Sequence, residues 1–201
     1  ARQMSDTEAM RVFHEPIMEV PDESRPGEVI RQRLDGSFFF GQKGLAVMRL
    51  GKDGFTQAAL LRFGPSLNHG HLDDLNINYY ARGYELTYDL GYGIGSTHTQ
   101  IGWAHATASH NVVVVDGKSQ GGGSSGGDLL SFADLPGLVQ AGASSTAYAH
   151  AGVATYQRFF ALTDEYALDV FRVQGGRQHD LPMHSLTSDV KFEGLAMDPP
   201  R

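Results

Sequence analysis

A short stretch, Asn68-His69-Gly70-His71-Leu72-Asp73-Asp74, holds the densest set of reactive side chains in the sequence. Two imidazoles stand one residue apart, and two carboxylates follow them directly. In an extended segment alternate side chains point to the same face, so His69 and His71 would share one space. Gly70 between them leaves room for a backbone or a ligand to approach closely. The pattern indicates metal or substrate binding; the alternative is a polar turn between strands with solvated histidines.

Two further candidate ligands, Asp89 and His110, follow along the chain. The sequence contains no cysteine, so a metal site can draw only on histidine, aspartate and glutamate. In adjacent antiparallel strands the end of one strand lies beside the start of the next, which lets His71 and Asp89 face each other. His110, just before a run of four valines, completes the trio if its strand neighbours that pair. Two histidines and one aspartate form a sound zinc set; the alternative is a group of unrelated surface residues.

The segments that must position these side chains are short and either apolar or alternating, which predicts strands. They lie at 38–40, 45–50, 58–63, 76–81, 84–89, 112–115, 137–141, 144–149, 155–162, 166–173 and 186–192. The valine run at 112–115 is continuous enough to be buried on both faces. A hairpin turn is expected at 51–54, and residues 119–127 are expected to be a mobile glycine/serine connector. Many short strands with regular turn signals predict an all-β antiparallel sandwich or barrel.

The N-terminal part has a different pattern. A capping serine followed by a glutamate predicts a helix over 5–13, and three prolines within 16–28 predict a linker. We therefore divide the chain into an N-terminal helix and linker, 1–34, and a β-sandwich domain, 35–201.

The composition of the chain limits its partners. A net charge of -7 argues against nucleic-acid binding, and no apolar run is long enough to span a bilayer, so we expect neither nucleic acid nor a membrane as a partner. Arginines gathered in a cleft could still bind an acidic sugar, although Arg62 and Arg82 could equally be ordinary strand-edge charges. Because Ala1 is not a methionine and the chain stops abruptly after Arg201, we expect a piece of a larger polypeptide.

Several blocks of the sequence occur in an order and spacing that is specific as a set. They are Gly44-Leu45-Ala46-Val47-Met48-Arg49, Asn68 to Asp73, Tyr88-Asp89-Leu90-Gly91, Ala108-Ser109-His110-Asn111, Tyr156-Gln157-Arg158 and His179-Asp180-Leu181-Pro182-Met183-His184. In these blocks the chain resembles the heparinase II/III-like polysaccharide lyases, a superfamily that includes heparin lyases and alginate or oligoalginate lyases.

This resemblance implies an antiparallel two-sheet β-sandwich that follows an α/α-toroid of helices, with the active cleft between the two. It implies β-elimination on a uronate-containing polysaccharide, in which a base removes the proton next to the uronate carboxyl and an acid protonates the departing glycosidic oxygen. It further implies structural zinc near the cleft on His71, Asp89 and His110, and a catalytic or substrate-binding role for His69.

Other polar residues are candidates from their position in or near these blocks, and the family pattern offers no clear equivalent for Tyr92 and His98. Asn68, Tyr92 and His98 are candidates for substrate binding. For Tyr92 and His98 the alternative is a structural role in the glycine-rich loop. His179 and His184 are expected to form hydrogen bonds within the sandwich.

The expected function is the sandwich portion of a uronate-polysaccharide lyase, periplasmic or secreted in a bacterium. Its partners would be an acidic polysaccharide or oligosaccharide and the toroid domain of the same protein. The toroid supplies the principal catalytic tyrosine in the family, so the isolated piece is expected to be inactive. The alternatives are a non-catalytic carbohydrate-binding or structural sandwich, and a zinc-dependent hydrolase that uses a zinc-bound water.

Overall fold

Two packed antiparallel sheets form the body of the structure, which is a computed structural model of the chain. The structure describes residues 17–21, 29–33, 36–41, 44–51, 56–64, 70–91, 100–122, 126–186 and 193. Within these ranges no helix is both long and apolar enough to cross a membrane.

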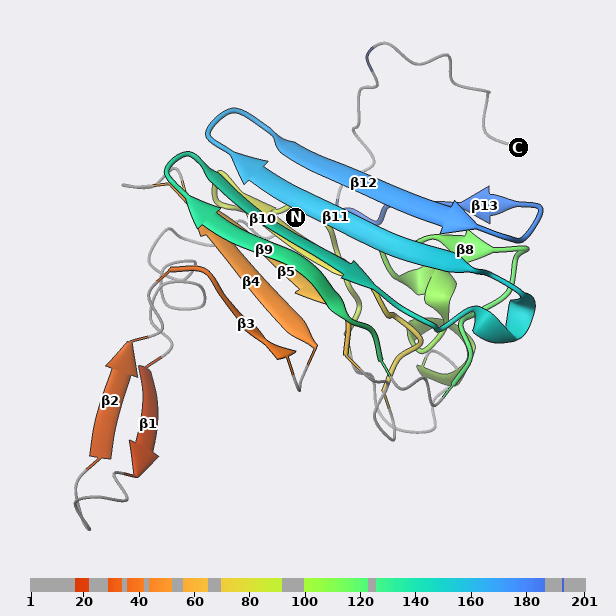
Figure 1. Cartoon of the computed structure of the whole chain (residues 1–201), viewed down its shortest axis with the longest axis horizontal. Helices are drawn as coiled ribbons and strands as arrows, with labels where there is room; N and C mark the ends of the chain where they lie inside the picture. The colour runs from red at the N-terminus through yellow and green to blue at the C-terminus, as the bar shows by residue number, and fades with distance from the viewer. Residues whose placement is uncertain are drawn as a thin grey trace.

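The first sheet has five strands in the order β3-β4-β5-β6-β7. Its strands are β3 (Phe38–Phe40), β4 (Leu45–Leu50), β5 (Gln57–Arg62), β6 (Ile77–Ala81) and β7 (Tyr84–Glu85). The second sheet has the order β12-β11-β10-β9 and lies over the first (Figure 1). Its strands are β9 (Leu129–Leu135), β10 (Leu138–Ser144), β11 (Thr155–Thr163) and β12 (Ala167–Gln174). The prediction of an all-β, antiparallel two-sheet sandwich is confirmed.

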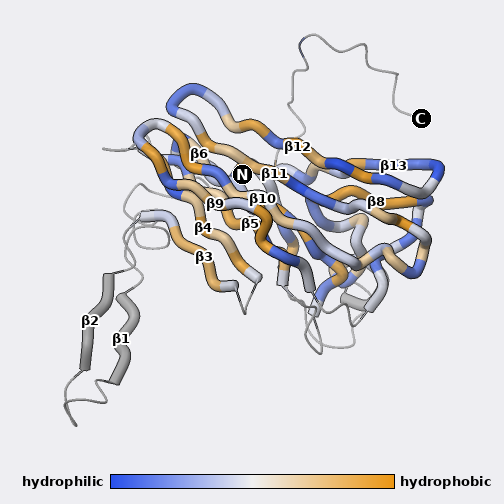
Figure 2. Tube along the Cα trace, viewed as in Figure 1, coloured by the Kyte–Doolittle hydropathy of each residue, from blue (hydrophilic) through white to orange (hydrophobic). Residues whose placement is uncertain are grey.

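The core lies between β4 and β5 of the first sheet and β10 and β11 of the second. Ala46 and Met48 of β4 are fully buried, whereas their strand neighbours are only half-buried. They belong to one apolar cluster with Val139, Phe160 and Leu162 of the other sheet. Figure 2 shows these strands as largely apolar, with polar positions between apolar stretches. Along β4 burial alternates with period two, so one face of the strand lies in the core, at roughly 1.5–3 kcal/mol for each large apolar side chain.

The valine run forms less strand than its composition predicts. All four valines at 112–115 are buried, as expected. Only Val114–Val115 form a strand, β8, which pairs with β13 (His179–Asp180). Val113 instead uses its carbonyl to accept a hydrogen bond from the Tyr156 hydroxyl of β11. At Val113 a tertiary hydrogen bond therefore takes the place of a sheet partner.

Two further expectations for the second half of the chain are wrong. Of the segment 144–149, Ser144 is the last residue of β10. Residues 145–149 leave the sheet, where the Ser145 hydroxyl donates to Asp74 Oδ2 at 2.7 Å and accepts from Ala147 N–H at 3.0 Å. In the segment 119–127, Gln120 is buried and donates to the Asp74 carbonyl at 2.9 Å, so this part of the predicted mobile connector is anchored. The strand β9 was not predicted at all.

The N-terminal segment contains a hairpin where a linker was predicted. The strand β1 (Ile17–Pro21) pairs with β2 (Val29–Arg33) in a separate two-stranded sheet. Neither segment alternates regularly, since β1 reads Ile-Met-Glu-Val-Pro and β2 reads Val-Ile-Arg-Gln-Arg, and the three prolines of 16–28 favoured a linker in the prediction. The helix predicted over 5–13, and nearly all of the strand predicted over 186–192, lie outside the described residues.

Candidate metal centre and its pocket

Three side chains converge at one end of the sandwich: His71, Asp89 and His110. One ligand atom of each lies within 4.8 Å of the others. His71 Nδ1 is 3.0 Å from His110 Nε2, which is 3.8 Å from Asp89 Oδ2. Two ligands of a tetrahedral zinc ion are about 3.3 Å apart, because each bond to the ion is about 2.0–2.1 Å long. The three atoms therefore have the spacing of ligands to one ion.

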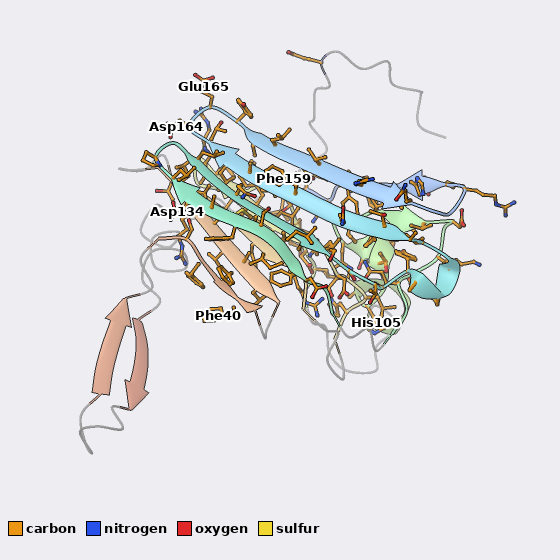
Figure 3. All side chains as sticks on the ribbon, in the orientation of Figure 1. Phe40, His105, Asp134, Phe159, Asp164 and Glu165 are labelled. Carbon is orange, nitrogen blue, oxygen red and sulfur yellow. The ribbon has the colours of Figure 1, made fainter. Side chains whose placement is uncertain are left out.

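All three side chains lie on loops, not at the strand ends where the sequence placed them. Hydrogen bonds between loops take the place of the sheet ladder. Leu72 N–H donates to the His105 carbonyl at 3.0 Å, and the Thr107 hydroxyl donates to the Leu72 carbonyl at 2.7 Å. These bonds hold the loop of His71 against the short turn that precedes His110. Figure 3 shows His105 among these loops, and Asp134 of β9 and Asp164 of the turn between β11 and β12 at the other end of the sandwich.

His110 is fully buried and is oriented by the backbone. Its Nδ1 lies 2.9 Å from the Ala106 carbonyl, which can only accept, so Nδ1 carries the proton and Nε2 presents a lone pair to the centre. Burial lowers the pKa of His110 to about 4, although the Asp89 carboxylate acts in the opposite direction. Burial also lowers the pKa of His71. Both imidazoles are therefore neutral at pH 7, which is the form that binds metals.

The Asp89 carboxylate is held by one donor on each oxygen. Asn76 Nδ2 donates to Oδ2 at 2.8 Å, and Gly91 N–H donates to Oδ1 at 2.8 Å. A carboxylate oxygen accepts in two directions, so Oδ2 retains a lone pair toward His110. Two neutral imidazoles and one oriented carboxylate form a donor set that fits zinc.

An open pocket of about 460 Å³ adjoins the centre, and its lining includes His71 and Asp89. Arg62, Asp73 and Glu85 also line it. The Arg62 guanidinium donates to Asp73 Oδ1 at 2.5 Å. Burial raises the pKa of Asp73 to about 7 against the opposing effect of Arg62, and burial together with the Asp89 charge raises the pKa of Glu85. The pocket thus combines a guanidinium with carboxyls that keep a proton more readily than usual.

The other candidate site residues, Asn68, His69, Tyr92 and His98, lie outside the described residues. The structure therefore reports on the predicted ligand set and on the pocket beside it. The roles assigned to these four side chains stay predictions.

Of the other singled-out histidines and arginines, two form structural hydrogen bonds and one lines the pocket. His184 Nε2 lies 2.8 Å from the Ala108 carbonyl and His179 Nε2 lies 2.7 Å from the Gly175 carbonyl, as predicted for hydrogen bonds within the sandwich. Arg62 is more than a strand-edge charge, because it lines the pocket and pairs with a buried acid.

Sequence reasoning missed two neighbours of the ligand set, Asn76 and His105. The His105 ring lies 6.3 Å from the His71 ring, centre to centre, and Asn76 bonds to Asp89. No spacing rule singles out His105. For Asn76 the available signal was a polar residue at the start of the alternating segment 76–81, at a position that the fold buries.

The family model described as "Heparinase II/III-like, C-terminal" matches residues 32–193 of the chain. No curated protein matches the chain.

Several solved structures share the fold at low sequence identity. The heparinase III BT4657 gene product has a TM-score of 0.60 at 20% identity, over 75% of this chain and 23% of that one. The heparan sulfate lyase HepC from Pedobacter heparinus has a TM-score of 0.61 at 17% identity, over 74% of this chain and 24% of that one. A further heparinase III has a TM-score of 0.59 at 15% identity, over 85% of this chain and 28% of that one. The chain thus spans about a quarter of the length of these proteins.

Proposed function

This chain belongs to the heparinase II/III-like C-terminal domain family, and from that membership we propose its function. The chain is, in this proposal, the β-sandwich portion of a polysaccharide lyase that cleaves a uronate-containing polysaccharide, either alginate or a glycosaminoglycan. The observation that carries the proposal is the convergence of His71, Asp89 and His110 beside an open pocket that contains Arg62.

The proposed reaction is a β-elimination. A base removes the proton from the carbon next to the uronate carboxylate, the bond to the glycosidic oxygen breaks as a carbon–carbon double bond forms, and an acid protonates the departing oxygen. The carbon-bound proton is a poor acid until the charge of the carboxylate is neutralised. Arg62 is a cation in the pocket that can serve this purpose. His69, next in the chain to the pocket residue Gly70, is the proposed proton-transfer group.

We propose that zinc is held by His71 Nδ1, His110 Nε2 and Asp89 Oδ2. Zinc would supply a cross-link between the three loops that carry these ligands, and its role would be structural. Because His71 is two residues from His69, fixing the position of His71 also restricts the position of His69. The lowered pKa values of both imidazole ligands favour this set, because neither ring is protonated to the imidazolium form at pH 7 and zinc does not have to compete with that proton.

The test is incubation of the full-length protein with alginate and with glycosaminoglycans. We expect the ultraviolet absorbance of an unsaturated uronate to rise for one of these substrates, to be lost in His69→Ala and to persist in His150→Ala, an exposed histidine on the turn Ala149–Ala151. No absorbance change with any common uronate polymer would overturn the proposal. Cleavage without a double bond would indicate a zinc-dependent hydrolase, and binding without cleavage a non-catalytic carbohydrate-binding sandwich.

A further inference from the structure

We propose that Asn76 is a positioning residue of the metal centre, one that joins the Asp89 carboxylate to the backbone beside His110. This inference rests on the metal site of the proposed function and deepens it. Asn76 would act on the ion through Asp89.

The Asn76 side chain spans two of the loops that carry ligands. It is 2% exposed, so water cannot substitute for its partners. Its Nδ2 donates to Asp89 Oδ2 at 2.8 Å, and its Oδ1 accepts from Asn111 N–H at 3.0 Å. Asn111 returns the link, because its own Nδ2 donates to the Tyr88 carbonyl at 3.1 Å. Two asparagine side chains therefore tie the chain at Asp89 to the chain at His110.

The backbone around Asn76 is held from both sides. Its carbonyl accepts from Arg62 N–H at 3.0 Å, and its N–H donates to the Asp73 carbonyl at 2.9 Å. The preceding residue, Leu75, has a φ of 69°, a left-handed conformation that is unfavourable for a residue with a Cβ. Such a conformation persists only where the surroundings enforce it.

Arg158 of β11 provides that enforcement from the opposite sheet. The side chain is fully buried and donates from one nitrogen to the Leu75 carbonyl, at 2.8 Å, and to the Asn111 carbonyl. Its other nitrogens form a two-point ion pair with Asp169, at 2.9 and 2.6 Å. The guanidinium thus fixes the residue before Asn76 and the residue after His110.

The consequence concerns the orientation of Asp89. Asn76 bonds to Oδ2, the same oxygen that lies 3.8 Å from His110 Nε2, so it sets the direction of the lone pair that faces the imidazoles. A carboxylate on a loop without this bond would sample several rotamers and would have to be ordered when the ion binds. Loss of such an orienting partner typically lowers metal affinity about 10–100-fold.

The experiment measures the zinc dissociation constant of the chain, by competition with a chromophoric chelator, for wild type, Asn76→Leu and Gln57→Leu. Gln57 is a matched control: it is a half-buried amide with two comparable bonds, to the Thr163 carbonyl at 2.7 Å and from the Tyr79 hydroxyl at 2.6 Å. It lies at the far end of β5, away from the ligands. We expect the constant to rise about 10–100-fold in Asn76→Leu and to stay unchanged in Gln57→Leu. The absorption spectrum of bound cobalt should change only in Asn76→Leu.

The other outcomes separate the positioning role of Asn76 from the existence of the metal centre. Equal zinc affinity and cobalt spectra for wild type and Asn76→Leu would overturn the positioning role while leaving the metal centre intact. Absence of zinc binding by wild type, with His71→Ala behaving identically, would overturn the metal centre of the proposed function and this inference with it. If circular dichroism shows that Asn76→Leu is unfolded, Asn76→Ser, which is too short to reach Asp89, gives the same comparison.

Discussion

Asp73 lines the pocket, and His110 lies in the candidate metal centre beside it. Both side chains are buried, and burial disfavours their charged forms. The pKa of Asp73 is raised to about 7, and the pKa of His110 is lowered to about 4. The raised pKa of Asp73 contributes stability that is present below its unfolded value, near 4, and is lost as the pH rises through 7. The pH dependence has the opposite sign for His110. Its lowered pKa contributes stability that is present above pH 6.5 and is lost as the pH falls toward 4.

We expect Asp73→Asn to remove the first of these dependences. In protein freed of metal by a chelator, the stability of the variant relative to wild type should increase between pH 4 and pH 8, by a few kcal/mol, at about 1.4 kcal/mol for each pKa unit. Urea unfolding at several pH values measures this difference. The exposed Asp134→Asn is the control, and parallel pH curves for the two variants would contradict the assignment.

The backbones of the two sheets approach each other closely at the end of the sandwich that carries the candidate metal centre. Gly127 N–H donates to the Phe63 carbonyl at 2.6 Å, just beyond β5. A Cβ on Gly127 would lie 1.6 Å from the Ser144 carbonyl oxygen at the end of β10. Only a residue without a side chain lets these backbones approach, since neither can move without disturbing its strand.

We expect Gly127→Ala to destabilise the fold by about 3 kcal/mol or more, because the clash is with backbone atoms of Ser144 at the end of β10, and the Phe63 carbonyl just beyond β5 is also tight, at 3.2 Å. Gly102→Ala is the control, because a Cβ there would meet nothing within 4 Å. The midpoint of urea unfolding should fall for Gly127→Ala and stay near wild type for Gly102→Ala. Equal midpoints would show that the β5–β10 contact is looser than the structure places it.

The whole molecule presents its candidate site on an open face. The pocket beside His71 and Asp89 is lined by loops and by β5–β7, and nothing in the described part of the chain closes over it. The solved relatives are about three times as long as this chain, and the sequence resemblance implies that a helical toroid forms the other wall of the cleft. An open half-site can bind a metal but cannot surround a sugar.

We therefore expect residues 1–201 alone to give no ultraviolet elimination signal with any uronate polymer that the full-length protein cleaves. The reason is that the resemblance implies a cleft formed between this sandwich and an α/α-toroid, with the principal catalytic tyrosine supplied by the toroid. The same assay under identical zinc and pH conditions compares the two proteins. Robust turnover by the short chain would mean that its own residues suffice for the reaction.

The sequence by itself determined the fold class, since short apolar or alternating runs separated by turn residues predict strands from local pattern alone; β4 begins and ends at the predicted residues, Leu45–Leu50. It also singled out His71, Asp89 and His110 as one ligand set, from residue chemistry, spacing and resemblance. Only the tertiary structure decided that loops rather than strand ends bring the three together, and that Asn76 and Arg158 orient those loops. These contacts join residues far apart in the chain, and their geometry depends on the path of every intervening loop, which no local pattern encodes.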